Sequence, residues 1–335
     1  MGQTSGSPRQ WTWATSVKLD ILDEYLSAFT RACKRAGTTV YIDLFAGGLH
    51  NRDRDFDRDL VGSSRLAPLA DPPFTKLRYI ELISKAESLR VELSKEFPGR
   101  DIKVFGGDCN TVLPRVLADL EDVRWAPTFA FVDPDGLQVR WETLELLAAH
   151  KLQRSSTKVE LWLLFPGAGL MRTLAHDPAK LSAEDRLRAD GLFGHTGWWP
   201  IYEDRITDRI DASQARAEYV NLMRFRLEQG LGYRRTHTIE LRNTRGTPMY
   251  NMIFATDSDA GDRIMASLYR KAWNKYPEMR QQLARQREKE QGVLSLFDLD
   301  PSLDFGKATA LQPYKHEPPW QPRGWGDTWP EAQER

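Results

Sequence analysis

An apolar strand that ends in an acid and a glycine turn constrains this chain more than any other feature. Residues 40–44 read Val-Tyr-Ile-Asp-Leu, a β-branched and aromatic run that favours a buried strand. The turn Phe45–Gly48 follows, and its two glycines let the chain change direction sharply. Doubly wound α/β sheets bind ligands at the carboxyl ends of their strands, so the sequence predicts a ligand beside Asp43 and this turn. The alternative is an ordinary strand followed by a glycine turn.

Strand-like and helix-like segments alternate along the rest of the first half. Further strands are predicted at residues 77–82, 102–105, 128–132 and 159–165, and the helices between them at residues 84–97, 111–120 and 141–150. This order predicts a parallel sheet with right-handed crossovers. Residues 233–241 and 250–256 alternate apolar and polar side chains around a turn sequence, which predicts an antiparallel hairpin at the end of the sheet.

Acidic residues recur where the predicted strands end. They are Asp43, Glu81, Asp108 and Asp133. The carboxyl ends of parallel strands meet at one edge of the sheet, where clustered carboxylates repel each other unless a ligand or backbone donors satisfy them. A sheet with a purely structural role has no need for such a row. We therefore expect this edge to be functional.

The composition predicts one large α/β domain with two irregular ends. Residues 1–10 are rich in Gly, Ser and Pro and are expected to be flexible, and residues 292–335 form a Pro- and Trp-rich tail. Between them, residues 11–291 form the domain, which opens with a helix within residues 11–36. Residues 49–64 are too polar for a core element and are expected to form a long loop over the strand ends.

The regular alternation stops at residues 168–230, which we expect to form a helical insert that caps the substrate side of the domain. Trp198 and Trp199 could stack there on a base, with Arg205 and Arg209 contacting phosphates. The alternative is that the tryptophans belong to the core and that the arginines pair with acids of the same segment.

Charge and cysteine content exclude several classes of protein. Lys plus Arg and Asp plus Glu each number 47, so the net charge is zero and any basic surface for nucleic acid must be local. Two cysteines are too few for a disulfide framework, and the histidines lack metal-binding spacing, so no metal site is predicted. No apolar run is long enough for a membrane span and the N-terminus lacks a signal-peptide core. We expect a cytoplasmic protein without membrane association.

Five parallel strands closed by a hairpin resemble the class I S-adenosylmethionine-dependent methyltransferases, which have a Rossmann-like fold. The resemblance implies that Asp43 and the turn Phe45, Ala46, Gly47 and Gly48 hold the methionine part of S-adenosylmethionine. It implies that Glu81 binds the ribose hydroxyls and that Asp108 faces the adenine amino group, with Leu82 and Cys109 beside them. Asp133 matches the start of the fourth motif, where the methyl acceptor meets the cofactor.

The chain more specifically resembles the three-Cys-motif partner protein (TcmP) family. The resemblance covers about residues 11–300, and the segments that carry it are Trp11-Thr12, 18–22, 25–26, 41–48, 131–136, 250–256 and 264–273. It implies the fold and a neighbouring three-cysteine protein as a partner. The chain lacks the three cysteines itself, as the resemblance implies for the partner.

The acceptor motif departs from that of amino-directed nucleic-acid methyltransferases. Those enzymes carry an acid or Asn, two prolines and an aromatic residue, whereas this chain reads Asp133-Pro134-Asp135-Gly136. The stacking ring is missing, unless a tryptophan of the insert replaces it. Asp133 and Asp135 are the predicted catalytic residues, because a carboxylate can orient or deprotonate the acceptor, and Pro134 is predicted to contact the substrate. The alternative is that Asp135 and Gly136 form a plain turn.

These patterns predict a methyltransferase that uses S-adenosylmethionine and acts on a nucleic acid or a nucleotide-containing substrate. A first alternative keeps the cofactor site but makes the protein a binding module for a three-cysteine (Fe–S type) protein. A second is a nuclease with Asp133, Asp135 and Glu81 as ligands of Mg²⁺. The nuclease leaves the glycine turn after Asp43 unexplained.

Overall fold

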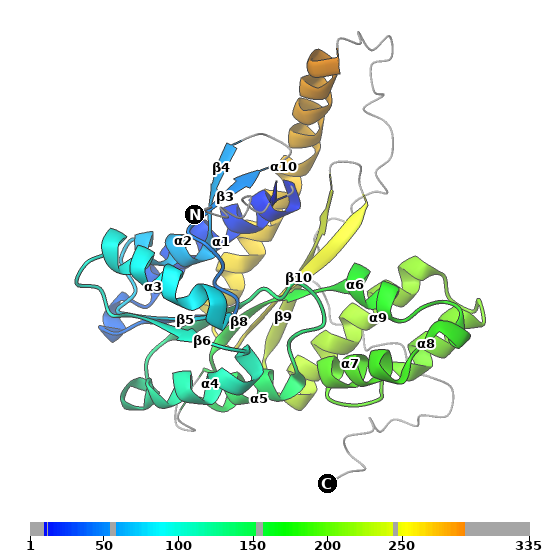
Figure 1. Cartoon of the computed structure of the whole chain (residues 1–335), viewed down its shortest axis with the longest axis horizontal. Coiled ribbons are helices and arrows are strands. Elements are labelled where there is room, and N and C mark those ends of the chain that lie inside the picture. The colour runs from blue at the N-terminus through cyan, green and yellow to red at the C-terminus, as the bar shows by residue number, and fades with distance from the viewer. Residues whose placement is uncertain (1–9, 12, 54–57, 152–156, 244–246, 292–335) are drawn as a thin grey trace, which may run out of the picture.

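The computed structural model describes residues 10–11, 13–53, 58–151, 157–243 and 247–291 (Figure 1). The predicted flexible N-terminus, apart from Gln10, and the predicted tail at residues 292–335 lie outside the described residues. In the part of the chain that is described, no helix has both the length and the apolar character needed to cross a membrane.

A seven-stranded sheet forms the centre of the molecule, with the order β6-β5-β2-β7-β8-β10-β9. Its strands are β2 (Val40–Asp43), β5 (Lys76–Glu81), β6 (Ile102–Gly106), β7 (Thr128–Val132), β8 (Glu160–Phe165), β9 (Arg235–Arg242) and β10 (Pro248–Thr256). The first five run parallel, and the hairpin of β9 and β10 adds an antiparallel edge next to β8. The predicted α/β class and mostly parallel sheet are confirmed.

Helices cover both faces of the sheet (Figure 1). One face carries α1 (Trp13–Ala32), α2 (Ser63–Leu69), α3 (Ile83–Glu96) and α10 (Asp259–Gln291), and the other carries α4 (Cys109–Ala118) and α5 (Trp141–Ala149). Successive residues of β2 point to opposite faces, so Ile42 packs with α4 and α5 while Tyr41 packs with α1. The continuous apolar runs read from the sequence are those of strands buried on both faces. Short 3₁₀ turns lie at η1 (Lys34–Ala36), η2 (Glu121–Val123) and η3 (Pro178–Lys180).

Four helices lie between β8 and β9 and form one group at the side of the molecule (Figure 1). They are α6 (Gly167–Thr173), α7 (Ala183–Phe193), α8 (Trp199–Ile206) and α9 (Ala212–Phe225), followed by the π-helical turn η4 (Arg226–Gly230). A capping box between Asp211 and Gln214 begins α9. The group shares the apolar core of α4 and α5, so it belongs to the same domain.

The prediction of a long polar loop at residues 49–64 is wrong, because much of this segment forms strands. Strands β3 (His50–Asp53) and β4 (Arg58–Val61) form an antiparallel pair, and β1 (Gln10–Trp11) joins them in parallel as a small second sheet. Side-chain polarity alone argued for a loop. The strands pair through their backbone groups, whatever the polarity of their side chains. The partner strand β1 lies about 40 residues earlier in the chain, so no local sequence pattern indicates this pairing.

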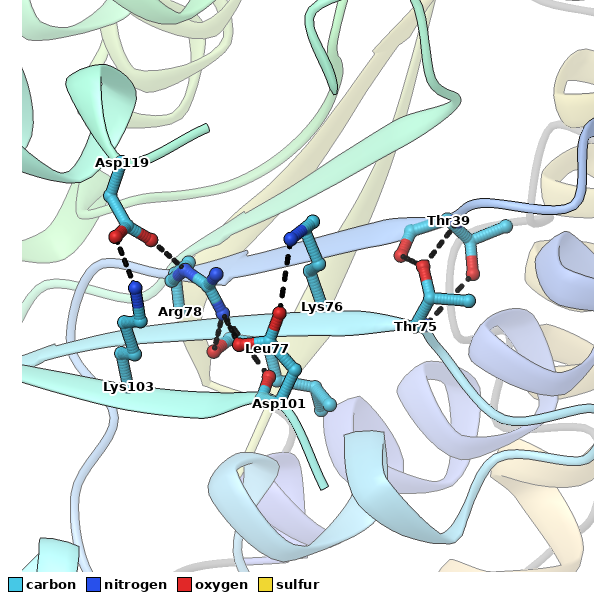
Figure 2. Close-up of polar contacts among 8 residues, drawn as sticks. All are labelled: Thr39, Thr75, Lys76, Leu77, Arg78, Asp101, Lys103 and Asp119. Carbon is cyan, nitrogen blue, oxygen red and sulfur yellow. Dashed lines mark hydrogen bonds and ion pairs between the residues drawn. The ribbon is translucent and has the colours of Figure 1, made fainter. Parts of the chain in front are cut away.

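A buried arginine fastens the β5–β6 edge of the sheet, as Figure 2 shows. Arg78 of β5 is only 1% exposed; its Nη1 lies 2.8 Å from Asp101 Oδ1 and its Nε lies 2.5 Å from Asp119 Oδ2. Lys76 and Lys103 bind the second oxygens of the same two carboxylates. The network joins β5 to the residues before β6 and after α4. It thereby fixes the strand whose last residue is Glu81.

Candidate functional site

A cleft of about 750 Å³ lies along the carboxyl ends of the parallel strands. This volume is within the range of small-molecule and cofactor sites. The residues that line it follow β2, β5, β6, β7 and β8, and further residues come from α1, α6, α9 and the start of β10. The predicted site residues on its wall are Phe45, Ala46, Gly47, Gly48, Glu81, Leu82, Asp108, Cys109, Asp133, Pro134 and Asp135.

The glycine turn is tied to the acid at the end of the neighbouring strand. Gly47 has a φ of +62°, a left-handed conformation that glycine adopts without strain. Its N–H donates a 2.7 Å hydrogen bond to Glu81 Oε2, and the Leu82 N–H donates one of 2.9 Å to Glu81 Oε1. Each carboxylate oxygen can accept a second hydrogen bond. Glu81 is thus held in place with acceptor capacity toward the cleft.

Asp43 supports this turn from behind and does not line the cleft. Its side chain is fully buried and accepts hydrogen bonds of 3.0 Å from the Phe45 N–H and 3.0 Å from the Tyr41 hydroxyl. Burial raises the pKa of Asp43 to about 7, even though the Ser63 hydroxyl and these donors lower it. The sequence predicts that Asp43 contacts a ligand directly. Its position does not support this, because neighbouring donors bind both of its oxygens and the side chain lies outside the cleft.

Asp108 caps the first turn of α4 at the β6 end of the cleft. Its Oδ1 accepts hydrogen bonds of 2.7 Å from the Asn110 N–H and 2.8 Å from the Asn110 side-chain amide. Cys109 beside it is buried, and burial raises the pKa of its thiol to about 12. The thiol therefore stays protonated at neutral pH and serves as a small apolar wall.

Asp133 meets a lysine that the sequence analysis did not assign to the site. The Nζ of Lys18, on α1, donates a hydrogen bond to Asp133 Oδ2, and both side chains line the cleft. Burial lowers the pKa of Lys18, but the charge of Asp133 and the neighbouring Tyr250 raise it, and the net shift is upward. Lys18 is therefore an ammonium ion in the cleft at neutral pH. Its Nζ also lies 5.5 Å from the centroid of the Tyr250 ring.

The helical periodicity of α1 contained a signal for Lys18. Positions 18, 22, 25, 26 and 29 form the apolar stripe of an amphipathic helix, and Lys18 occupies the first of them. A charged residue on a buried stripe needs a partner, and Asp133 supplies it. Lys18 is thus the position of this helix whose role could have been inferred from the sequence pattern.

The substrate-binding roles predicted for the tryptophans and arginines of residues 198–209 are not supported by their positions. Trp198 is 1% exposed and its indole N–H donates to Asp190, so it is a core residue and cannot stack on a base. Trp199 packs partly buried against Trp198, and neither lines the cleft. Arg205 binds the Leu174 carbonyl at 2.7 Å, and Arg209 pairs with Asp204 at 2.5 Å, also outside the cleft. The alternative of a core tryptophan is correct for Trp198, and the acid pairing is correct for Arg209.

Two other arginines of the same helical segment do line the cleft. They are Arg172 of α6 and Arg216 of α9. The Gly167 Cα has no side chain, and a Cβ placed there would lie 3.3 Å from Arg216 Cγ, so the glycine makes room for this arginine. The sequence showed a basic segment, but which arginines face the cleft depends on how α6 and α9 pack.

Neither a protein-family model nor a curated protein matches this chain. Among the described residues, no group of three or more His, Cys, Asp or Glu side chains is arranged to hold a metal ion. Both cysteines are free thiols. Assignment of a function therefore depends on the chemistry of the cleft.

Proposed function

We propose that this protein is an S-adenosylmethionine-dependent methyltransferase of the class I type, similar to the three-Cys-motif partner family. The observation that carries the proposal is the row of polar groups along the cleft in a sheet of order β6-β5-β2-β7-β8-β10-β9. Glu81 is the last residue of β5, and Asp108, the Gly47 turn and Asp133 follow β6, β2 and β7. Adjacent strands therefore present these four groups side by side along one edge of the sheet.

The acceptor groups and apolar side chains of the cleft suit each part of the proposed cofactor. Glu81 has acceptor capacity for the two ribose hydroxyls, and Asp108 can accept from the adenine amino group. Leu82 is 57% exposed on the cleft wall, and with the Cys109 thiol it offers apolar surface to an adenine ring. The open turn at Gly47 admits the methionine part, and Asp43 acts by holding that turn.

The cofactor supplies an activated methyl group on a sulfonium, so the protein's contribution is chiefly to align the acceptor. Asp133 is the residue we propose for this role. Lys18 occupies one side of its carboxylate, which fixes the side-chain orientation, and the remaining lone pairs can accept from an acceptor N–H or O–H. Asp135, two residues further on, lies on the same wall; its N–H donates a 3.1 Å hydrogen bond to Gln138.

The geometry favours this proposal over a magnesium-dependent nuclease. The Glu81 oxygens already accept two backbone N–H groups, and Asp133 already binds an ammonium ion. An ammonium ion on a ligating carboxylate would compete with a divalent cation. The α6–α9 group contributes Arg172 and Arg216 to the cleft, which supports the proposed capping role of this segment.

Methyl transfer can be tested with tritiated S-adenosylmethionine and three acceptor pools: total RNA, genomic DNA and free nucleotides. We expect label in one pool, and we expect Asp133→Asn to lower the rate by about 10²-fold or more, the usual contribution of a positioned acid–base group. A Glu87→Ala variant on the exposed surface of α3 serves as control. Cofactor binding without transfer to any pool would instead favour the binding-module alternative.

A further inference from the structure

The cleft is polarised along its length. Its β5–β6 end carries the acids Glu81 and Asp108 together with Lys85, and its β8 end carries Arg172 and Arg216 with no acid beside them among the described lining residues. Four strand intervals separate β6 from β8, and at about 4.8 Å each the two ends lie roughly 19 Å apart. This length exceeds that of one nucleoside, so the two ends meet different groups of the bound molecules.

Arg172 and Arg216 line the cleft and have no acidic partner in the described part of the chain. Neither makes an ion pair with the described carboxylates, and the buried Nε of Arg216 has no hydrogen-bond partner there. By contrast, Arg188 pairs with Glu184, and Arg209 pairs with Asp204. A guanidinium held at a cleft wall without a counter-charge favours an anion that comes from outside the protein.

We propose that Arg172 and Arg216 form an anion subsite that binds a phosphate group of the methyl acceptor. Two guanidinium groups from different helices can approach one phosphate from two sides, each through paired N–H donors. At the opposite end two acids outnumber one lysine, so the end with the two arginines is the more favourable one for a phosphate. Asp133 follows β7, the strand between β2 and β8 in the sheet, and the acceptor thus extends from Asp133 toward α6 and α9.

The subsite rests on the proposed function for the role of its ligand, but phosphate binding can be measured without methyl transfer. The probe is a fluorescein-labelled, random-sequence, single-stranded RNA of ten nucleotides, followed by anisotropy at 50 and 200 mM salt. Unlabelled competitors are the four nucleoside 5′-monophosphates and the four uncharged nucleosides. S-adenosylmethionine affinity is measured calorimetrically for every variant.

The variants are Arg172→Gln, Arg216→Gln and Arg216→Lys, with Arg188→Gln as a control of equal charge change on an exposed helix. Arg172 is exposed, so its replacement keeps the test independent of any packing defect at Arg216. We expect each Gln variant to weaken RNA binding about tenfold or more, as for a lost charge-assisted hydrogen bond. We expect Arg216→Lys to lose less and Arg188→Gln to change nothing. Binding should weaken as the salt concentration rises.

Competition by the monophosphates but not by the nucleosides shows that the phosphate of a single nucleotide is sufficient for binding. Competition by neither identifies the phosphodiester backbone, and both results support the subsite. The proposed subsite is overturned if wild type and both Gln variants bind RNA equally. It is also overturned if nucleosides compete as strongly as the monophosphates do. A loss of S-adenosylmethionine affinity in the Gln variants overturns it as well, because the arginines would then bind the cofactor's carboxylate. If wild type binds no S-adenosylmethionine yet the RNA results hold, the methyltransferase proposal fails and the anion subsite stands.

Discussion

The Nζ of Lys18 donates a hydrogen bond to the carboxylate of Asp133, which lies 115 residues further along the chain. This contact makes the first helix of the domain part of the cleft wall. The Lys18 side chain is 7% exposed and that of Asp133 is 22% exposed, so the pair is shielded from solvent but open to a ligand. We interpret it as the device that fixes Asp133 beside the methyl acceptor.

Replacing Lys18 with Met should lower the methyl-transfer rate about tenfold or more and leave S-adenosylmethionine affinity within a factor of about three. The reason is that an unpaired Asp133 loses one charge-assisted hydrogen bond, worth about 1.5–3 kcal/mol, and with it a fixed orientation. Single-turnover kinetics and calorimetry measure the two quantities. Lys18→Arg keeps the charge and should recover part of the rate. Equal methyl-transfer rates in Lys18→Met and wild type would show that Lys18 does not orient Asp133 for the reaction.

Glu160 should make the protein less stable as the pH rises toward 8. The residue is 4% exposed, and its carboxyl group accepts hydrogen bonds from the hydroxyls of Tyr25 and Thr256. Burial raises its pKa from 4.5 to about 7. Between these values the folded state holds a proton that the unfolded state has released. Its contribution to stability is therefore complete below about pH 4.5 and is lost as the pH rises through about 7.

Denaturant unfolding of wild type and Glu160→Gln at pH 5, 6, 7 and 8 tests this. The free energy of unfolding of wild type should fall relative to that of the variant, by at most about 1.4 kcal/mol per pH unit for one proton. Because both proteins contain Asp43, its own titration cancels in the difference. A constant difference across these four pH values would show that Glu160 is ionised in the folded protein throughout.

Removing both acids that face Arg78 should destabilise the β5–β6 edge strongly. In the double variant Asp101→Asn, Asp119→Asn the guanidinium stays buried without a counter-charge, which costs about 3–5 kcal/mol. Lys103 is half exposed, so Lys103→Gln should cost less than about 1 kcal/mol. Urea unfolding measures both. Similar losses in the two variants would mean that Arg78 remains solvated or finds another partner.

The centre of the sheet was predictable from the sequence because β2, β7 and β8 are buried on both faces and consist mostly of apolar residues. The stretch at 128–132, for example, is a strand with those bounds. Glu81 and Asp108 were predictable as cleft residues for a related reason: a residue that ends a parallel strand lies at one known edge. Nothing local revealed β1, whose partner is a distant backbone, or the burial of Trp198.

The positions of the arginines could not be predicted from the sequence. The basic segment contains Arg172, Arg205, Arg209 and Arg216, and its sequence does not distinguish between them. The way α6, α8 and α9 pack together decides which of them line the cleft. Asp43 shows a second limit. Its place at the end of β2 was correct, but its neighbours Tyr41 and Phe45 occupy its oxygens and make it a support for the turn.

Calorimetric titration with S-adenosylmethionine, and with its demethylated product, tests the central claim most directly. We expect wild type to bind both. Glu81→Ala should weaken binding by about 1–3 kcal/mol, because the ribose hydroxyls lose a charged acceptor held by the Gly47 and Leu82 N–H groups. Glu87→Ala, on the exposed side of α3, should bind as wild type does. An absence of binding to wild type, or equal affinities for wild type and Glu81→Ala, would contradict the assignment of this cleft to S-adenosylmethionine.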